Sequence, residues 1–216
     1  MSGRGVPDLS LYLVTSSELT GRGRLVDTVV AATTGGVSLV QLREPDASDA
    51  DVLALGRDLV AALAPTGVPL LINDRVHLVE DIGAAGAHVG QDDLDPVKAR
   101  ELIGADRWLG QSVQTVEQAR AASDSGEVDY LGMGPAWPTA TKQVTVPPLG
   151  AEGVRTIAHA TELPSVAIGG IGVDEVPQLR TSGIRGVAVV SAICGRLDPR
   201  GEATRLRAAW ETGIAL

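Results

Sequence analysis

Eight short runs of aliphatic and β-branched residues recur along the chain, and each is followed by a longer stretch with the apolar spacing of a helix. This alternation is typical of parallel α/β proteins, because parallel strands need crossover helices between them. Eight strand–helix units in 216 residues predict a compact (β/α)8 TIM barrel, with a doubly wound open sheet as the alternative. No linker divides the chain, so we expect one domain over residues 1–216. The expected strands are Leu9–Val14, Val37–Arg43, Pro69–Asn73, Ala87–Gly90, Trp108–Ser112, Tyr130–Gly134, Ser165–Gly169 and Gly186–Ser191.

Three of the expected helices carry recognisable capping residues at their starts. The apolar residues of Asp51–Leu63 fall on one face, which predicts an amphipathic helix, and Ser48 before it begins a sequence that resembles a capping box. Thr115 and Gln118 match that box better. Asp95 precedes a proline, a pairing that predicts an N-cap followed by a first-turn proline.

Charge and cysteine content exclude several classes of partner. The formal net charge is −9 and no basic stripe is present, which argues against a nucleic-acid surface. Cys194 is the one cysteine, so we expect no disulfide framework, no Cys-based zinc site and a cytoplasmic location. No apolar run approaches the length that crosses a bilayer. We therefore expect a cytoplasmic protein that binds small molecules and neither nucleic acid nor membrane, while a homodimer remains open.

Polar residues gather where the expected strands end, which is where barrel enzymes carry their chemistry. The second strand ends with Val-Gln-Leu-Arg at positions 40–43, and two-residue alternation puts Gln41 and Arg43 on one face. We expect this pair to point into the barrel mouth while the aliphatic pair faces the helices. The alternative is that Arg43 forms a salt bridge with Glu44 at the rim.

Two carboxylates follow neighbouring strands. Asp74 comes directly after the third strand and Asp93 lies just beyond the fourth. Oxygen ligands supplied singly by separate loops suit a Mg²⁺ ion that also binds a substrate phosphate. The joint appearance of the two residues favours a metal site, although Asp74 alone could instead cap the helix expected to begin near Val76.

Two turns and one long loop add candidate anion-binding groups. Gly170 follows the seventh strand, and Val190 and Ser191 end the eighth, where barrels commonly hold a phosphate on backbone N–H groups. Loops longer than about 12–15 residues are usually functional. Such a loop is expected over residues 134–150.

That loop contains Thr139, Thr141 and Lys142, whose two hydroxyls and ammonium group suit an anion. Of the two lysines in the chain, Lys142 is the one expected near the mouth, because Lys98 lies on a predicted helix.

The remaining reactive residue types are interpreted as structural. His77 and His159 fall within expected helices, and His88 lies at a strand start. We expect Cys194 to be a small buried apolar group. No nucleophile–base pair is evident.

Five stretches follow one another in an order and at spacings that characterise a known family. They are Val40–Glu44, Leu71–Arg75, His88–Asp93, Gly134–Lys142 and Val166–Ile171. On these motifs, from about Leu11 to Ile193, the chain resembles thiamine-phosphate synthase. The resemblance implies a (β/α)8 barrel that joins hydroxymethylpyrimidine diphosphate to a thiazole phosphate and releases pyrophosphate.

The resemblance also implies a set of site residues. Asp74 and Asp93 would hold Mg²⁺, and Arg43, Lys142 and Ser112 would be catalytic. The pyrimidine diphosphate would contact Gln41, Arg43, Asn73, Ser112 and Lys142, and the thiazole phosphate would contact Thr139, Thr141, Gly170, Val190 and Ser191. Ionisation of the diphosphate followed by capture of the methylene cation would need no base, because the thiazole nitrogen carries no proton to remove.

The chain departs from the family at two positions. Pro45 stands where a lysine is common, so one expected pyrophosphate cation is missing, and Trp137 replaces the usual phenylalanine of the lid. A paralogous thiazole tautomerase is one alternative function, which Pro45 favours and the retained carboxylates oppose. A noncatalytic barrel that binds a thiazole phosphate is a second. A Schiff-base aldolase is weaker, because its lysine must sit on a strand inside the barrel.

Overall fold

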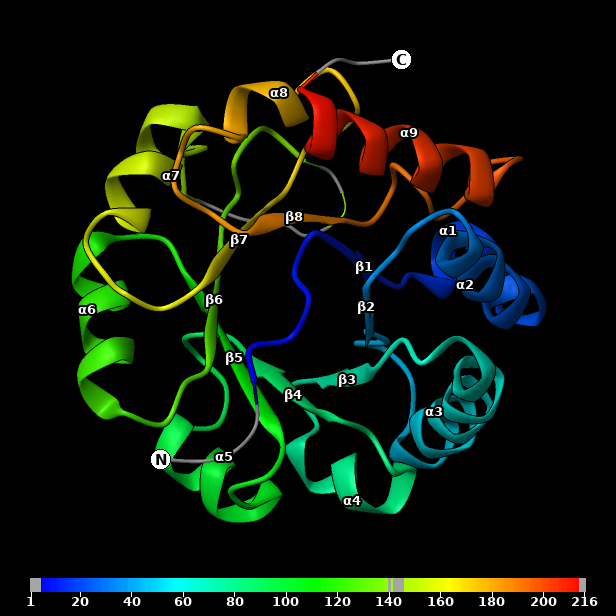
Figure 1. The fold of residues 1–216 in the computed structure, drawn as a ribbon. Coiled ribbons are helices and arrows are strands. Elements are labelled where there is room, and N and C mark those ends of the chain that lie inside the picture. The colour runs from blue at the N-terminus through cyan, green and yellow to red at the C-terminus, as the bar shows by residue number, and fades with distance from the viewer. Residues whose placement is uncertain (1–4, 140, 142–145, 214–216) are drawn as a thin grey trace.

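The computed structural model describes residues 5–139, 141 and 146–213, and within them eight parallel strands form a closed barrel in the order β1 to β8 (Figure 1). The helices surround the strands on the outside. The strands are β1 Leu11–Val14, β2 Leu39–Leu42, β3 Leu70–Asn73, β4 Gly86–Val89, β5 Trp108–Val113, β6 Tyr130–Met133, β7 Ser165–Ile168 and β8 Gly186–Val189. The predicted barrel is therefore confirmed, and the open-sheet alternative is wrong, because β1 pairs with β8 as well as with β2.

The helical segments connect successive strands, except α9, which follows the last strand. They are α1 Ser17–Thr20, η1 Arg22–Arg24, α2 Leu25–Thr34, α3 Asp49–Leu63, η2 Ala64–Thr66, η3 Val76–Leu78, α4 Val79–Ile82, α5 Pro96–Ile103, α6 Val116–Ser125, α7 Gly150–Ala158, α8 Val176–Leu179 and α9 Pro199–Thr212. None of the described helices is long and apolar enough to cross a membrane.

The predicted helix caps are present, with one difference. Ser48 Oγ accepts a hydrogen bond from the backbone N–H of Asp51, so α3 begins two residues before the expected start. Thr115 Oγ1 caps α6, but the Gln118 side chain accepts from the N–H of Gln114 rather than from that of the cap residue itself. The capping box thus closes one residue earlier than predicted.

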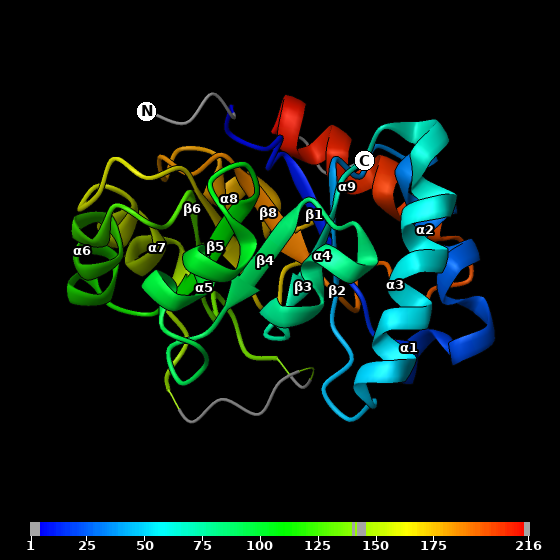
Figure 2. The same cartoon turned by 90° about the horizontal axis from the view of Figure 1, so that it is seen from below.

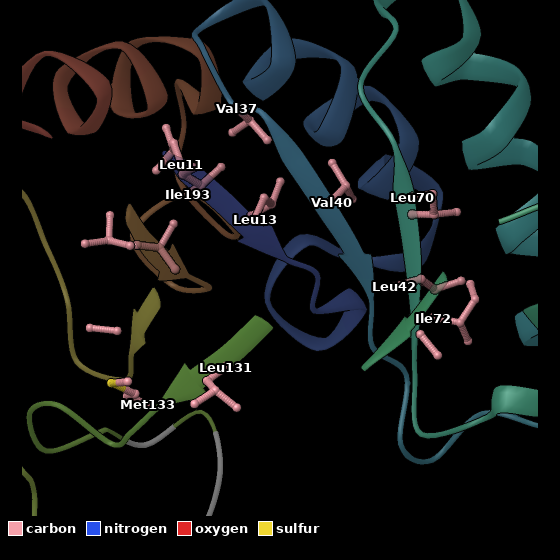
Figure 3. Close-up of a cluster of buried hydrophobic side chains, with 14 of the residues drawn as sticks. Leu11, Leu13, Val37, Val40, Leu42, Leu70, Ile72, Leu131, Met133 and Ile193 are labelled. Carbon is pink, nitrogen blue, oxygen red and sulfur yellow. The ribbon is translucent and has the colours of Figure 1, made fainter. Parts of the chain in front are cut away.

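Aliphatic side chains fill the layer between the strands and the helices (Figure 3). Leu11 and Leu13 of β1, Val40 and Leu42 of β2 and Ile72 of β3 all belong to this layer, and each is at most 1% exposed. Alternate residues on these strands face outward, as the period of two requires. The burial of this layer is the main favourable contribution to folding.

A smaller apolar cluster fills the inside of the barrel toward its N-terminal end. It includes Leu9, Leu39 and Leu71, each at most 2% exposed. The segment before β1 crosses this end, where the indole N–H of Trp108 donates to the carbonyl oxygen of Gly5 at 2.8 Å (Figure 1). This end of the interior is therefore covered, and the functional groups lie at the other end.

Candidate active site

A cavity with a volume of about 140 Å³ lies at the end of the barrel where the strands terminate. The connection from β2 to α3 and the described part of the loop after β6 both lie at this end, opposite the N-terminal segment (Figure 2). Nine of the ten residues expected to contact substrate line the cavity. They are Gln41, Arg43, Asn73, Ser112, Thr139, Thr141, Gly170, Val190 and Ser191. The tenth, Lys142, lies outside the described residues.

Strand β2 orients its polar residues as the two-residue alternation predicts. Gln41 is 4% exposed and points inward, and Arg43 is half-buried and lines the same cavity. The alternative pairing of Arg43 with Glu44 is absent among the described ion pairs. Glu44 Oε1 instead accepts the backbone N–H of Ser17 at 3.0 Å. The Arg43 guanidinium therefore lines the cavity without a carboxylate partner in the described chain.

A second, more polar cavity of about 230 Å³ adjoins the first and shares Arg43 and Thr141 with it. Its wall comes mainly from the segments after β1 and β2 and includes Ser17 and Pro45. The Ser17 hydroxyl is buried and has no hydrogen-bond partner in the part of the chain that the structure describes. Arg43 therefore lies between an inner cavity and an outer one.

The two candidate metal ligands lie at the end of the same pair of strands. The backbone N–H of Asp74 donates to the His88 carbonyl at 2.9 Å, and Asp93 Oδ2 accepts the N–H of Gly90 at 2.7 Å. Both acidic residues are thus anchored to the last residues of β4 and the turn after it. Neither lines the inner cavity.

The backbone at Asp74 is unusual. Its φ of 58° is positive, which no other non-glycine residue in the described chain shares. Aspartate tolerates this left-handed conformation better than most residues, but it still costs free energy. The 3₁₀ segment that follows begins at Val76 and has Arg75 as its N-cap residue, without a side-chain cap, which does not support the alternative in which Asp74 caps a helix there.

The carboxylates fit a divalent cation in ligand chemistry. Asp74 is exposed at a strand end. Asp93 uses its Oδ2 atom to accept from Gly90, so its Oδ1 atom is the second carboxylate oxygen of that residue. Hard oxygen ligands of this kind suit Mg²⁺ when substrate oxygens complete the shell. No cluster of three or more His, Cys, Asp or Glu residues occurs in the described chain, so protein atoms alone would not complete the coordination.

The long loop after β6 is fastened at its base on two sides. Ala136 N–H donates to the Ile168 carbonyl and Trp137 N–H to that of Gly169, which joins the loop to the end of β7. The Leu149 and Gly150 N–H groups donate back to the first residues of the loop, at Pro135 and Ala136. The predicted loop therefore ends where α7 begins.

Thr139 and Thr141 lie just beyond the fastened base, and the Thr141 N–H donates to Thr139 Oγ1 at 3.2 Å. Gly170 contacts the same loop closely, because a Cβ atom there would meet the Pro138 carbonyl at 2.6 Å. Its φ of 65° also favours glycine. The turn after β7 and the loop after β6 thus form one continuous wall of the cavity.

Sequence reasoning missed Arg75, which organises the connection after β2. Its guanidinium donates to the carbonyl oxygens of Glu44, Pro45 and Ala47 and pairs with Asp49 at 2.9 Å. Four contacts from one side chain fix the loop that follows Arg43. A charged residue directly after Asp74 was visible in the sequence, but nothing local indicated that its partners lie about 30 residues earlier.

Sequence reasoning also missed the polar interior of the barrel. His88 was interpreted as structural, yet it is 7% exposed, lines the cavity and contacts Ser112 Oγ at 2.9 Å. Tyr12 and Tyr130 lie behind it and are buried completely, which raises the pKa of both phenols above the usual value. Strand alternation, applied to all eight strands, would have put these three residues on the inner face.

The other residues interpreted as structural lie away from the cavity. His77 pairs with Asp49, and His159 contacts the Arg155 carbonyl on the surface. Cys194 is 2% exposed, and burial raises the pKa of its thiol to about 11.

Comparisons with known proteins agree with this arrangement. Residues 11–193 match the family model described as thiamine monophosphate synthase. A thiamine-phosphate synthase of Azorhizobium caulinodans is 43% identical over 95% of this chain and 96% of its own length. One of Albidiferax ferrireducens is 46% identical over 92% and 90%.

A solved structure agrees as well. Thiamine phosphate pyrophosphorylase from Pyrococcus furiosus superposes with a TM-score of 0.85 at 31% identity, over 95% of this chain and 96% of that one. With the barrel, the cavity and these relatives in agreement, the chain belongs to the thiamine monophosphate synthase family.

Proposed function

We propose that this transferase makes thiamine phosphate by Mg²⁺-dependent, dissociative displacement at the methylene carbon of 4-amino-5-hydroxymethyl-2-methylpyrimidine diphosphate. The ring nitrogen of the thiazole phosphate is the nucleophile, and pyrophosphate is the leaving group. The observation that carries the proposal is the inner cavity, whose wall holds nine residues from six separate strand ends and loops.

The pyrimidine ring occupies the inner cavity, between Gln41 and Ser112. Apolar residues such as Val166 and Ala188 line the same cavity and support stacking of the ring, while Asn73 provides an amide at its edge.

The diphosphate extends outward to Arg43, which separates the two cavities. Arg43 and Lys142 supply the positive charge that stabilises the charge developing on the leaving pyrophosphate. The buried hydroxyl of Ser17 is a further donor within the outer cavity. Pro45 provides no cation there, so Arg43 carries a larger share of this stabilisation.

Asp74 and Asp93 would hold the Mg²⁺ ion, with diphosphate oxygens as its remaining ligands. When bound, the ion supplies positive charge to the leaving group. The backbone bond from Asp74 to His88 and the bond from Gly90 to the Asp93 carboxylate support this assignment, because they hold both residues at neighbouring strand ends.

The thiazole phosphate binds on the opposite wall, formed by Thr139, Thr141, Gly170, Val190 and Ser191. Hydroxyl groups and the backbone N–H groups of the turns after β7 and β8 are suitable donors for its phosphate. The thiazole nitrogen then faces the methylene carbon and needs no general base. We propose a cytoplasmic location on the single buried cysteine.

The test mixes the purified enzyme with both substrates and Mg²⁺ and measures thiamine phosphate and pyrophosphate. We expect both products in equal amounts, and neither after the metal is removed with a chelator. The matched variants are Arg43→Gln, which should lose most activity, and Arg57→Gln, a surface change on α3 that should retain it. Turnover of a thiazole phosphate without pyrophosphate release would instead identify a tautomerase, and binding without turnover a noncatalytic barrel.

A further inference from the structure

Five polar side chains form one continuous chain of hydrogen bonds through the inside of the barrel. Gln41 Nε2 donates to Tyr12 Oη at 2.5 Å, and Tyr12 Oη lies 2.9 Å from Tyr130 Oη. Tyr130 Oη lies 2.9 Å from His88 Nδ1, and His88 Nε2 lies 2.9 Å from Ser112 Oγ. The chain begins and ends at residues that line the inner cavity, and its middle member, Tyr130, is behind the cavity wall.

The amide of Gln41 sets the direction of the chain. Tyr12 accepts from Gln41 and has one proton, and because both phenols are buried, that proton is satisfied by donation to Tyr130. Tyr130 in turn donates its own proton to His88 Nδ1. A neutral imidazole that accepts at Nδ1 carries its proton on Nε2, so His88 donates to Ser112 Oγ.

This direction determines what the two ends present to a ligand. Ser112 Oγ already accepts from His88, so its hydroxyl proton is available to donate into the cavity. Gln41 uses its NH₂ group on Tyr12, so its carbonyl oxygen is available to accept. The opposite direction would exchange these roles at both ends together, because each hydroxyl has only one proton.

The barrel makes specific room for the chain. A Cβ atom at Gly110 would lie 2.2 Å from Tyr130 Cζ and 2.4 Å from His88 Nδ1, so no larger residue fits there. The Tyr130 ring packs edge-on against Tyr12 and lies 5.5 Å from the His88 ring, centroid to centroid. Burial raises the pKa of both phenols, which keeps their protons in place at neutral pH.

We propose that Tyr12, Tyr130 and His88 are positioning residues that fix Ser112 as a hydrogen-bond donor and the Gln41 carbonyl as an acceptor toward the pyrimidine half of the substrate. An aminopyrimidine offers the complementary pair, a ring nitrogen that accepts and an amino group that donates. This inference rests on the proposed function and adds three residues to it. The chain would thus select for an aminopyrimidine before any chemistry occurs.

The test uses Tyr130→Phe, which removes one oxygen atom and fits the space beside Gly110. We expect the KM for the pyrimidine diphosphate to rise about five- to tenfold, as for one lost hydrogen bond, while the KM for the thiazole phosphate stays within about twofold. In a Ser112→Ala background the same change should raise the pyrimidine KM by a smaller factor, because only the Gln41 end of the chain is then left to orient.

A pyrimidine diphosphate analogue with one ring nitrogen replaced by C–H provides a second readout. The ratio of the KM for this analogue to the KM for the natural pyrimidine diphosphate should be several-fold larger in the unaltered enzyme than in Tyr130→Phe. The matched control is Trp108→Phe, which removes the indole hydrogen bond to Gly5 at the covered end of the barrel and should leave both KM values unchanged.

Two results would overturn the proposal. In the first, Tyr130→Phe lowers the melting temperature but leaves the pyrimidine KM unchanged. In the second, Tyr130→Phe raises the pyrimidine KM by the same factor with and without the Ser112 hydroxyl. If Tyr130→Phe fails to fold, Tyr12→Phe interrupts the chain one step earlier and must give the same KM split. If the unaltered enzyme made no thiamine phosphate, the proposed function would fail, while calorimetric Kd values for the pyrimidine diphosphate would still decide the role of the chain.

Discussion

The two ends of the barrel interior differ in chemistry, although the same strands build both. On β2, three alternate residues show the difference: Leu39 is fully buried at the covered end, Gln41 joins a hydrogen-bonded chain, and Arg43 lines the open cavity. Over four residues along this face, the local environment thus changes from apolar to polar to charged. The covered end contributes stability, and the open end carries the binding groups.

The same division holds on neighbouring strands. On β3, Leu71 lies in the apolar cluster and Asn73 lines the cavity, and Asp74 follows in its unusual backbone conformation. The comparison teaches that residues at the covered end should change the free energy of unfolding when mutated. Residues at the open end should change kinetics instead.

Asp74→Asn should have the largest effect on activity. Asparagine also tolerates the left-handed backbone, so the variant removes a charge without adding strain. We expect kcat/KM to fall by roughly 100-fold or more and the Mg²⁺ concentration for half-maximal activity to rise, because a metal ligand is weakened. Steady-state rates measured across a Mg²⁺ titration check this.

The control for that change is Asp92→Asn, at an exposed residue next to Asp93. This control variant has the same net charge as Asp74→Asn. It should retain the metal dependence of the unaltered enzyme. If both variants lost activity equally, a general effect of negative charge at the open end would explain the result better than a metal site.

Leu39→Ala should have the largest effect on stability. Its side chain is 0% exposed in the apolar cluster at the covered end, so truncation leaves a cavity and costs about 2–5 kcal/mol. Denaturant unfolding followed by circular dichroism measures the loss. The folded fraction should keep both KM values within about twofold, and a selective rise in one of them would break the division between the two ends.

The sequence predicted the barrel well because each strand reports its own environment locally. Strand runs, their outward aliphatic faces and the caps at Ser48 and Thr115 depend on neighbours within a few residues, and all were predicted correctly in kind. The orientation of Gln41 and Arg43 followed from the same local rule. These features need no knowledge of distant partners.

The polar interior and the Arg75 contacts could not be predicted in the same way. The oxygen of Tyr130 has partners 118 residues earlier in Tyr12 and 42 residues earlier in His88, and no local pattern encodes such a pairing. The backbone of Asp74 likewise depends on the distant carbonyl of His88. Hydrophobic periodicity could be read from the sequence, whereas these long-range hydrogen bonds could not.

Ser48→Ala tests whether location at the open end is sufficient to affect function. Ser48 caps α3 at that end but is exposed and lines neither cavity. Loss of the cap should lower the free energy of unfolding by about 1 kcal/mol and leave the kinetics unchanged. Ser48→Asp, which restores a capping oxygen, should recover the stability. A change in either KM in Ser48→Ala would show that α3 transmits strain to the cavity.

Cys194 should give the smallest effect on activity, although it follows β8 only three residues after Ser191. Its thiol belongs to the outer aliphatic layer, 3.9 Å from the Val14 carbonyl, so Cys194→Ala should leave kcat and both KM values within about twofold. Burial raises the pKa of this thiol from 9.0 to about 11, which leaves very little thiolate at pH 8. Alkylation by iodoacetamide should therefore be about 100-fold slower in the folded enzyme than in urea.

The same thiol predicts a pH dependence with a defined sign. The unfolded chain releases this proton near pH 9.0 and the folded chain near pH 11, so the stabilising contribution is complete below pH 9 and decreases as the pH rises to 11. Over that window the free energy of unfolding should fall more steeply for the unaltered enzyme than for Cys194→Ala. If the free energy of unfolding fell equally steeply in both proteins, or if the thiol were alkylated rapidly at pH 8, solvent would reach the outer aliphatic layer at the open end. The outer layer at that end would then not be part of the stable, apolar region of the molecule.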